Sequence, residues 1–203
     1  MFTGLIQTIG TLIKSAPTPT GRRLEVDPGA WDHHPALGDS IAVSGCCLTL
    51  AAPRTTPDEP FAFDVIHETL EKTRLGRLEL GDPVNLEHAV TASTLMGGHF
   101  VQGHIDAVGT VEQVQTGDDY RIMVRPPPDL MRFIAPKGSI TIDGVSMTIA
   151  MTDPARGVFE LAIIPTTLEK TTLGQLAKGD PVNLEADILA KTTIHYIEHY
   201  SNR

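Results

Sequence analysis

The sequence predicts an all-β protein made of two tandem copies of a small antiparallel barrel and followed by a C-terminal α-helix. Three observations support this fold: the chain repeats itself, its apolar and polar residues alternate at period two, and it is rich in turn-forming residues. The 18 glycines and 15 prolines favour turns over long helices. The 203 residues suffice for two domains of about 100 residues each.

The repeat is visible in three blocks that keep their order and spacing. GLIQTIGTL at 4–12 matches GHIDAVGTV at 103–111, and SIAVSGCCLTL at 40–50 matches SITIDGVSMTI at 139–149, both 99 positions later. TLEKTRLGRLELGDPVNLE at 69–87 matches TLEKTTLGQLAKGDPVNLE at 167–185, 98 positions later. We infer an internal duplication whose boundary falls at the paired glycines of LMGGHF, residues 95–100. The predicted parts are an N-terminal barrel at 1–97, a C-terminal barrel at 98–186 and a helix at 187–203.

Each half is predicted to consist of short strands separated by turns. Residues 40–45, 61–66 and 158–164 alternate as half-buried strands do. In the two GDPVNLE segments, Pro83 and Pro181 fix φ at the entrance of a strand. Residues 69–76 are the exception, because Thr69 can cap a short helical turn and Gly76 can end it.

The tail at 187–203 changes to helical spacing. Its apolar residues form one stripe, which consists of Ile188, Leu189, Tyr196, Ile197 and Tyr200. The stripe either docks on its own chain or meets the same helix of another subunit. The subunit contact is favoured, because a helix that follows a complete repeat has little core left to cover.

Composition excludes several classes of protein. The formal net charge of −9 does not suit nucleic-acid binding, which needs clustered Lys and Arg. No apolar run approaches the roughly 20 residues of a membrane span, so we expect no membrane contact. The start, MFTGLIQTIG, lacks the features of a secretion signal, and the two cysteines are adjacent, which disfavours a disulfide. We therefore expect a cytoplasmic protein with free thiols.

One position of the repeat carries different chemistry in its two copies. GCCLTL at 45–50 matches GVSMTI at 144–149, so Cys47 stands where Ser146 stands. Successive side chains of a strand point to opposite faces. Because Val145 matches Cys46, we predict that Cys46 faces the core and Cys47 faces a surface or pocket. Two merely structural cysteines are the alternative, and one adjacent pair does not make a tetrahedral metal site.

A second asymmetry lies in GGHFVQGHI at 97–105. His99 and His104 are five apart, a spacing that matches neither one face of a strand or helix nor a usual zinc motif. His104 stands where the first copy has Leu5, and histidine can move protons near neutral pH. A hydrogen-bonded surface histidine is the alternative, and Asp143, whose counterpart is Ser44, has a solvated surface role by default. The pattern alone indicates a duplicated barrel protein that binds a small molecule between its halves.

Several motifs together resemble the riboflavin synthase family over nearly the whole chain. They are MFTGLI at 1–6, GCCLTL at 45–50, ETLEKTRLG at 68–76, MGGHFVQGHID at 96–106, IDGVSMT at 142–148, TLEKTTLG at 167–174 and GDPVNLEAD at 179–187. The resemblance implies two six-stranded Greek-key barrels and a C-terminal helix that helps to assemble a homotrimer, with an association with lumazine synthase as a further partner. It implies a transferase without metal or organic cofactor. Two molecules of 6,7-dimethyl-8-ribityllumazine dismutate by transfer of a four-carbon unit, which gives riboflavin and 5-amino-6-(D-ribitylamino)uracil.

The resemblance also implies roles for individual residues. The reacting pair lies between the N-terminal barrel of one subunit and the C-terminal barrel of its neighbour. His104 and Ser146 assist deprotonation of the acidic 7-methyl group, and Cys47 activates or replaces the nucleophile that adds to the partner lumazine. Ser44 and Thr166 depart from the family pattern, which often has asparagine and glutamate there.

Pocket residues follow from the same resemblance. Phe2 packs near the reacting pair, and Lys137 and Asp187 lie near the site. The first pocket is expected to be lined by Gly4, Leu5, Ile6, Leu48, Thr49, Asp64, Val65, Ile66, His67, Glu68 and Thr69. The second is expected to be lined by Gly103, His104, Ile105, Met147, Thr148, Ile164, Pro165, Thr166, Thr167, Leu168 and Glu169.

Two other classes of function compete with the enzyme. Lumazine proteins share the duplicated fold and carry a lumazine or flavin without converting it, so they need only one working pocket. Here both copies keep the motif glycines and threonines, and Cys47, His104 and Ser146 occur together, which favours the enzyme. A structural barrel without a ligand leaves the repeated pocket motifs unexplained.

Overall fold

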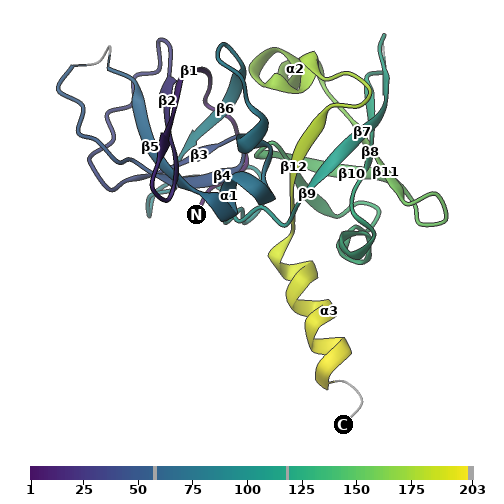
Figure 1. Ribbon diagram of the computed structural model, residues 1–203. Coiled ribbons are helices and arrows are strands. Elements are labelled where there is room, and N and C mark those ends of the chain that lie inside the picture. Colours follow the sequence, from purple (N-terminus) through teal and green to yellow (C-terminus); the bar gives the residue numbers. More distant parts are fainter. Residues whose placement is uncertain (57–58, 118, 201–203) are drawn as a thin grey trace.

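The computed structural model describes residues 1–56, 59–117 and 119–200. Two six-stranded antiparallel sheets lie side by side, and one helix leaves the second sheet (Figure 1). This confirms the predicted duplicated all-β fold. Within the described ranges, no helix has the length and apolar character that crossing a membrane requires.

The first sheet nearly closes into a barrel. Its strands follow the order β4-β3-β6-β1-β2-β5, and a single bridge between Leu50 and Phe63 connects the two ends of that order. Buried side chains such as Leu24, Phe61 and Leu86 fill its interior. The strands are β1 (Thr8–Thr18), β2 (Gly21–Asp27), β3 (Ser40–Val43), β4 (Cys46–Thr49), β5 (Phe61–Ile66) and β6 (Pro83–His88).

The second sheet is a closed barrel with the same connectivity, in the order β10-β11-β8-β7-β12-β9. Register repeats as well: Ser146 pairs with Thr141, just as Cys47 pairs with Ala42 in the first sheet. The duplication in the sequence is therefore a duplication of strand pairing. The strands are β7 (Ala107–Gln115), β8 (Arg121–Arg125), β9 (Ser139–Ile142), β10 (Val145–Asp153), β11 (Val158–Ala162) and β12 (Pro181–Ala186).

Short helices follow equivalent strands of the two sheets. α1 (His67–Lys72) leads into the 3₁₀ helix η1 (Arg74–Arg77), α2 (Pro165–Lys170) leads into η3 (Thr172–Gln175), and η2 (Pro128–Phe133) precedes β9. The predicted cap is wrong by one turn: Thr69 lies inside α1, while the Thr73 side chain caps η1 by accepting from the Leu75 amide. Gly76 does not end the helix. It lies within η1, where a Cβ would come 2.2 Å from the Leu70 carbonyl oxygen.

The C-terminal helix α3 (Ile188–Tyr200) projects away from both sheets (Figure 1). An ion pair of 3.0 Å between Arg132 of η2 and Glu198 ties it to the second barrel. Leu189, Tyr196 and Ile197 remain 61%, 61% and 48% exposed. The described chain therefore leaves much of the predicted apolar stripe uncovered, and residues 201–203 of the predicted helix lie outside the described residues.

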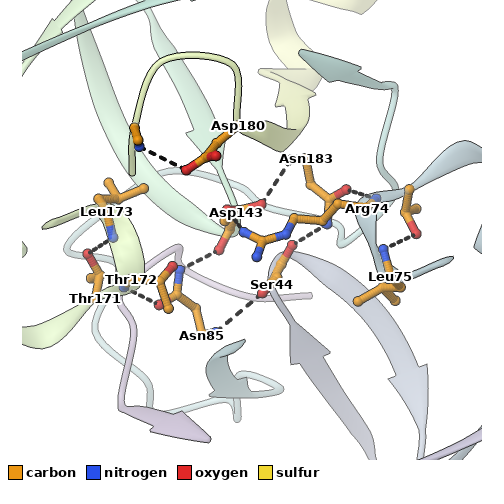
Figure 2. Close-up of polar contacts among 12 residues, drawn as sticks. Ser44, Arg74, Leu75, Asn85, Asp143, Thr171, Thr172, Leu173, Asp180 and Asn183 are labelled. Atoms are coloured by element: carbon orange, nitrogen blue, oxygen red, sulfur yellow. Dashed lines mark hydrogen bonds and ion pairs between the residues drawn. The ribbon is translucent and has the colours of Figure 1, made fainter. Parts of the chain in front are cut away.

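The sheets meet at matching glycine turns. A Cβ on Gly45 would lie 2.6 Å from the amide nitrogen of Gly144. A Cβ on Gly144 would lie 2.6 Å from the amide nitrogen of Gly45. Two asparagines then bridge the sheets reciprocally (Figure 2): Asn85 donates to the Asp143 carbonyl at 3.0 Å, and Asn183 to the Ser44 carbonyl at 2.8 Å. Their amide oxygens accept backbone N–H groups of η3 and η1 from the opposite repeat, at 2.9 and 2.7 Å.

One ion pair breaks the symmetry of this junction. The guanidinium of Arg74 binds the carboxylate of Asp143, whose side chain is fully buried (Figure 2). The matching positions of the other repeat hold the uncharged Thr172 and Ser44. The default surface role of Asp143 is therefore wrong, because a cation from the opposite repeat compensates for the burial of this carboxylate.

Candidate functional site

The outward faces of two equivalent strands carry the groups that the sequence analysis singled out. Cys47 and Thr49 lie on the outward face of β4, while Cys46 is only 5% exposed and belongs to the first core. This confirms the predicted orientation of the two cysteines. In β10, Ser146 and Thr148 face outward in the same way. The alternation of the strand places the side chains of Leu48 and Met147 in the cores, so only their backbone groups are left to line the pockets.

The loops that precede the two barrels are exchanged between them. The amide of Cys47 donates to the carbonyl of Gly103 at 2.8 Å, and the amide of Ser146 donates to the carbonyl of Gly4 at 2.8 Å. The expected grouping is therefore wrong. Gly4, Leu5 and Ile6 reach the Ser146 strand, while Gly103, His104 and Ile105 reach the Cys47 strand.

Packing of the two isoleucines agrees with the exchange. Ile105 packs against the core of the first barrel, although it precedes the second barrel in sequence. Ile6 packs against the core of the second barrel. Each pocket is therefore assembled from both halves of the chain.

Two glycines make this close approach possible. Gly4 has φ +77° and Gly103 has φ +80°, a region that L-residues rarely adopt. A Cβ on Gly4 would lie 2.6 Å from Cβ of Ser146, and one on Gly103 would lie 2.6 Å from Cβ of Cys47. A side chain at either glycine would displace the loop from the strand.

Two buried glutamates fix the loops. Glu87 of β6 accepts from the Thr3 amide at 2.6 Å and from the Gly4 amide at 3.0 Å. Glu185 of β12 accepts from the Gln102 and Gly103 amides at 2.8 and 2.9 Å. Burial raises the pKa of both carboxyls, although these hydrogen bonds act in the opposite direction. The sequence analysis missed both residues, whose signal was an acidic side chain at a repeated strand position.

The first pocket surrounds the Cys47 thiol. It is an open cavity of about 190 Å³ lined by Cys46, Cys47, Glu68, Thr69, Lys72, Thr73, Gly103, His104 and Ile105. Lys72, which was not predicted, donates to Glu68 at 2.6 Å. Phe2 is fully buried, packs with Cys47, and its ring would lie 3.0 Å from a Cβ on Gly103. The structure thus brings a thiol, an imidazole and an ammonium–carboxylate pair to one cavity.

Four other residues expected at the first pocket do not line this cavity. Val65 belongs to the first core. Asp64 forms an exposed ion pair of 2.6 Å with Arg23 on β2. Ile66 and His67 are exposed where β5 ends and α1 begins. Asp64 and Val65 are therefore engaged in the barrel itself rather than in the cavity around Cys47.

Ser146 has a histidine partner, but it is not the expected one. The Ser146 Oγ lies 2.7 Å from Nδ1 of His99, whereas His104 lines the Cys47 cavity. Burial lowers the pKa of His99, and the carboxylate of Asp187, between β12 and α3, opposes that shift. In the sequence, His99 is a candidate only as half of a metal pair. Among the described residues, no group of three His, Cys, Asp or Glu side chains is placed to hold a metal ion.

The remaining residues expected at the second pocket surround α2 and β9. Thr167 and Leu168 are half-buried, and Leu168 packs against the second core. Lys137 is exposed in the turn that enters β9, with φ +67°. The other expected residues at α2 are exposed: Ile164, Pro165, Thr166 and Glu169.

Comparison with known proteins agrees with this geometry. A family model described as the lumazine binding domain matches residues 3–89 and 102–187. Riboflavin synthase of Mycobacterium bovis is 39% identical over 193 residues, covering 94% of this chain and 95% of that protein. Riboflavin synthase of Escherichia coli is 36% identical over 201 residues, covering 98% of this chain and 92% of that protein.

Solved structures show the same fold with ligands bound. LumP complexed with riboflavin has a TM-score of 0.81 and 29% identity, covering 92% of this chain and 99% of that chain. LumP complexed with 6,7-dimethyl-8-(1'-D-ribityl) lumazine has a TM-score of 0.79 and 28% identity, with the same coverage.

Two tandem barrels with exchanged loops and two family matches define a protein with a pair of lumazine-binding domains. Its full-length relatives are enzymes, and the chain belongs to the riboflavin synthase family. The family resemblance drawn from the motifs is thus confirmed.

Proposed function

We propose that this enzyme binds two molecules of 6,7-dimethyl-8-ribityllumazine in its two kinds of pocket and transfers a four-carbon unit from one to the other. Riboflavin and 5-amino-6-(D-ribitylamino)uracil are the products. The observation that carries this proposal is the pairing of unlike groups on a duplicated frame: Cys47 with His104 in one pocket, and Ser146 with His99 in the other. Two molecules of one substrate fit two pockets of related shape. Because one molecule donates the four-carbon unit and the other accepts it, the two pockets require different side chains.

The proposed roles follow the placement of the groups. Ser146 and His104 act on the acidic 7-methyl group, and the Cys47 thiol activates or replaces the nucleophile that adds to the partner lumazine. His104 and Ser146 lie in different pockets of one chain. Both can reach one reacting pair when the first pocket of one subunit faces the second pocket of its neighbour.

A homotrimer supplies such neighbours in this proposal. Its support is α3, which projects from the barrel and exposes Leu189, Tyr196 and Ile197. An apolar stripe of this kind is suited to burial against another subunit. Cytoplasmic location and association with lumazine synthase belong to the same proposal. The location is supported by the two free cysteines, and the association by the family resemblance.

Incubating the purified protein with 6,7-dimethyl-8-ribityllumazine and measuring riboflavin tests the proposal. We expect one riboflavin for every two lumazines consumed. A protein that binds the lumazine tightly and leaves it unchanged is a carrier like LumP, and that result contradicts the proposal. A protein that neither binds nor converts the lumazine is a structural barrel, which contradicts it equally.

A further inference from the structure

Ser146 receives its imidazole partner from outside the repeat. His99 lies in the linker between the barrels, ahead of the segment at 103–111 that matches 4–12. Its Nδ1 lies 2.7 Å from Ser146 Oγ, which is a short hydrogen bond. The duplication therefore explains the position of Ser146 but not that of its partner.

The linker is held against Ser146 by backbone contacts. The amide of His99 donates to the Thr3 carbonyl at 3.2 Å. A Cβ on Gly98 would lie 2.0 Å from that same carbonyl oxygen and 3.1 Å from Ser146 Oγ, so only glycine fits there. The His99 ring is thus placed by its own main chain and by the N-terminal loop.

The charge state and the tautomer of His99 together decide which atom donates. Burial lowers its pKa from the ordinary value of 6.5, and Asp187 is the charged group whose field raises it. A neutral imidazole with an unprotonated Nδ1 accepts a hydrogen bond from the Ser146 hydroxyl. The serine oxygen then turns its lone pairs to the pocket. A protonated imidazole donates instead, which turns the serine O–H outward.

We propose that His99 is a positioning residue of the second pocket that sets the direction of the Ser146 hydroxyl. With His99 neutral and Nδ1 unprotonated, Ser146 presents an acceptor oxygen, which suits a ring N–H or the acidic methyl group of a lumazine. With His99 protonated, Ser146 presents a donor. The consequence for turnover rests on the proposed function, whereas the hydrogen-bond geometry does not.

Two variants of His99 test the pair kinetically, with single-turnover riboflavin formation measured from pH 5 to 8. His99→Ala is expected to slow the step by about tenfold to a hundredfold, the range for one lost positioning hydrogen bond. His99→Asn places an amide near the position of Nδ1. It is expected to restore part of the rate and to remove the acid limb of the profile below pH 6.5.

The Ser146→Ala/His99→Ala double variant separates positioning from structure. We expect it to be no slower than Ser146→Ala alone, because His99 acts through the serine. Cys47→Ser, in the other pocket, is the matched control, because the thiol acts on the partner lumazine and not through Ser146. Its effect is expected to add to that of Ser146→Ala. Additive effects of the His99 and Ser146 changes, or an acid limb that persists in His99→Asn, overturn the proposal.

A titration of ¹⁵N-labelled histidines by NMR tests the pair without any reaction. We expect the His99 ring signals and midpoint to shift in Ser146→Ala, with the other histidines as internal references. A shifted midpoint in a protein that converts no lumazine supports the pair and refutes the proposed function. An unshifted His99 in an active enzyme overturns the pair and leaves the function standing.

Discussion

The amide of Cys47 donates a 2.8 Å hydrogen bond to the carbonyl of Gly103, a residue that precedes the other barrel. The equivalent bond joins Ser146 to Gly4 at the same distance. Neither half of the chain therefore builds a complete pocket from its own residues. The exchange makes the geometry of the pockets depend on how the two barrels dock. Substitutions in the exchanged loops are therefore expected to affect both the stability of the fold and lumazine binding.

Gly103→Ala tests the contact between the exchanged loop and the Cys47 strand. The new Cβ would lie 2.6 Å from Cβ of Cys47 at φ +80°, so we expect a loss of about 2–5 kcal/mol in unfolding free energy and weaker lumazine binding. Gly38→Ala is the matched control, because Gly38 also has positive φ but nothing within 4 Å of its added Cβ. It is expected to lose only about 1–2 kcal/mol. If the two variants lose equal free energy of unfolding in urea, Gly103 is needed only for its positive φ and not for the close contact with Cys47.

The two thiols are predicted to differ in reactivity. Both cysteines line the open cavity, but Cys46 is buried, which raises its pKa to about 12, whereas Cys47 is half-buried. Iodoacetamide is expected to modify Cys47 first, and bound riboflavin is expected to slow that reaction. Mass spectrometry of Cys47→Ser and Cys46→Ser identifies the site. A fast phase that survives in Cys47→Ser contradicts this assignment.

The buried carboxyl of Glu87 predicts the direction in which the free energy of unfolding changes with pH. Burial raises the folded-state pKa of Glu87 above 4.5, so the folded state holds this proton more tightly. The resulting stability is present below pH 4.5 and is lost as pH rises through the folded-state pKa. We expect the cost of Glu87→Gln to be larger at pH 5 than at pH 8 in urea unfolding. Glu68→Gln, at an exposed ion pair, is the control, and a cost that grows with pH would reverse the assignment.

The ion pair at the junction predicts an asymmetric response to substitution. Arg74→Thr leaves the fully buried Asp143 carboxylate without its cation, which is expected to cost about 3–5 kcal/mol. Adding Asp143→Ser copies the uncharged pair of the opposite side and is expected to recover much of the loss. The exposed Arg23–Asp64 pair is the control, and Arg23→Ala is expected to change little. A double variant as unstable as Arg74→Thr would show that the pair itself, rather than an orphaned charge, holds the junction.

The sequence pattern predicted the strands of the barrels well, because the alternation of side chains along a strand depends only on neighbouring residues. Alternation in 40–50 correctly placed Cys46 in the core and Cys47 outside, since successive side chains of a strand face opposite ways. The pocket residues came from the family resemblance instead, which does not state whether a residue such as Leu48 contributes its side chain or its backbone, and the Leu48 side chain lies in the core. Burial of Asp143 was missed because its partner Arg74 is 69 residues away.

The exchange of loops lay beyond the sequence pattern for a different reason. GLI at 4–6 and GHI at 103–105 are alike, and each suits either strand equally well. Tertiary docking of the barrels decides which loop meets which strand. The Ser146–His99 pair was missed for the same reason, because the repeat aligns His104 with Leu5 and offers no counterpart for the linker histidine.

Mixed assemblies test most directly the claim that unlike pockets of two subunits meet. His104→Ala damages the first pocket, and Ser146→Ala damages the second. Unfolding the two variants together and refolding them as an equal mixture pairs an intact first pocket with an intact second pocket at about one interface in four. We predict that the mixture regains about a quarter of the wild-type rate of riboflavin formation. A mixture that never exceeds the mean rate of the two separate variants would place each reacting pair within one chain and contradict the claim.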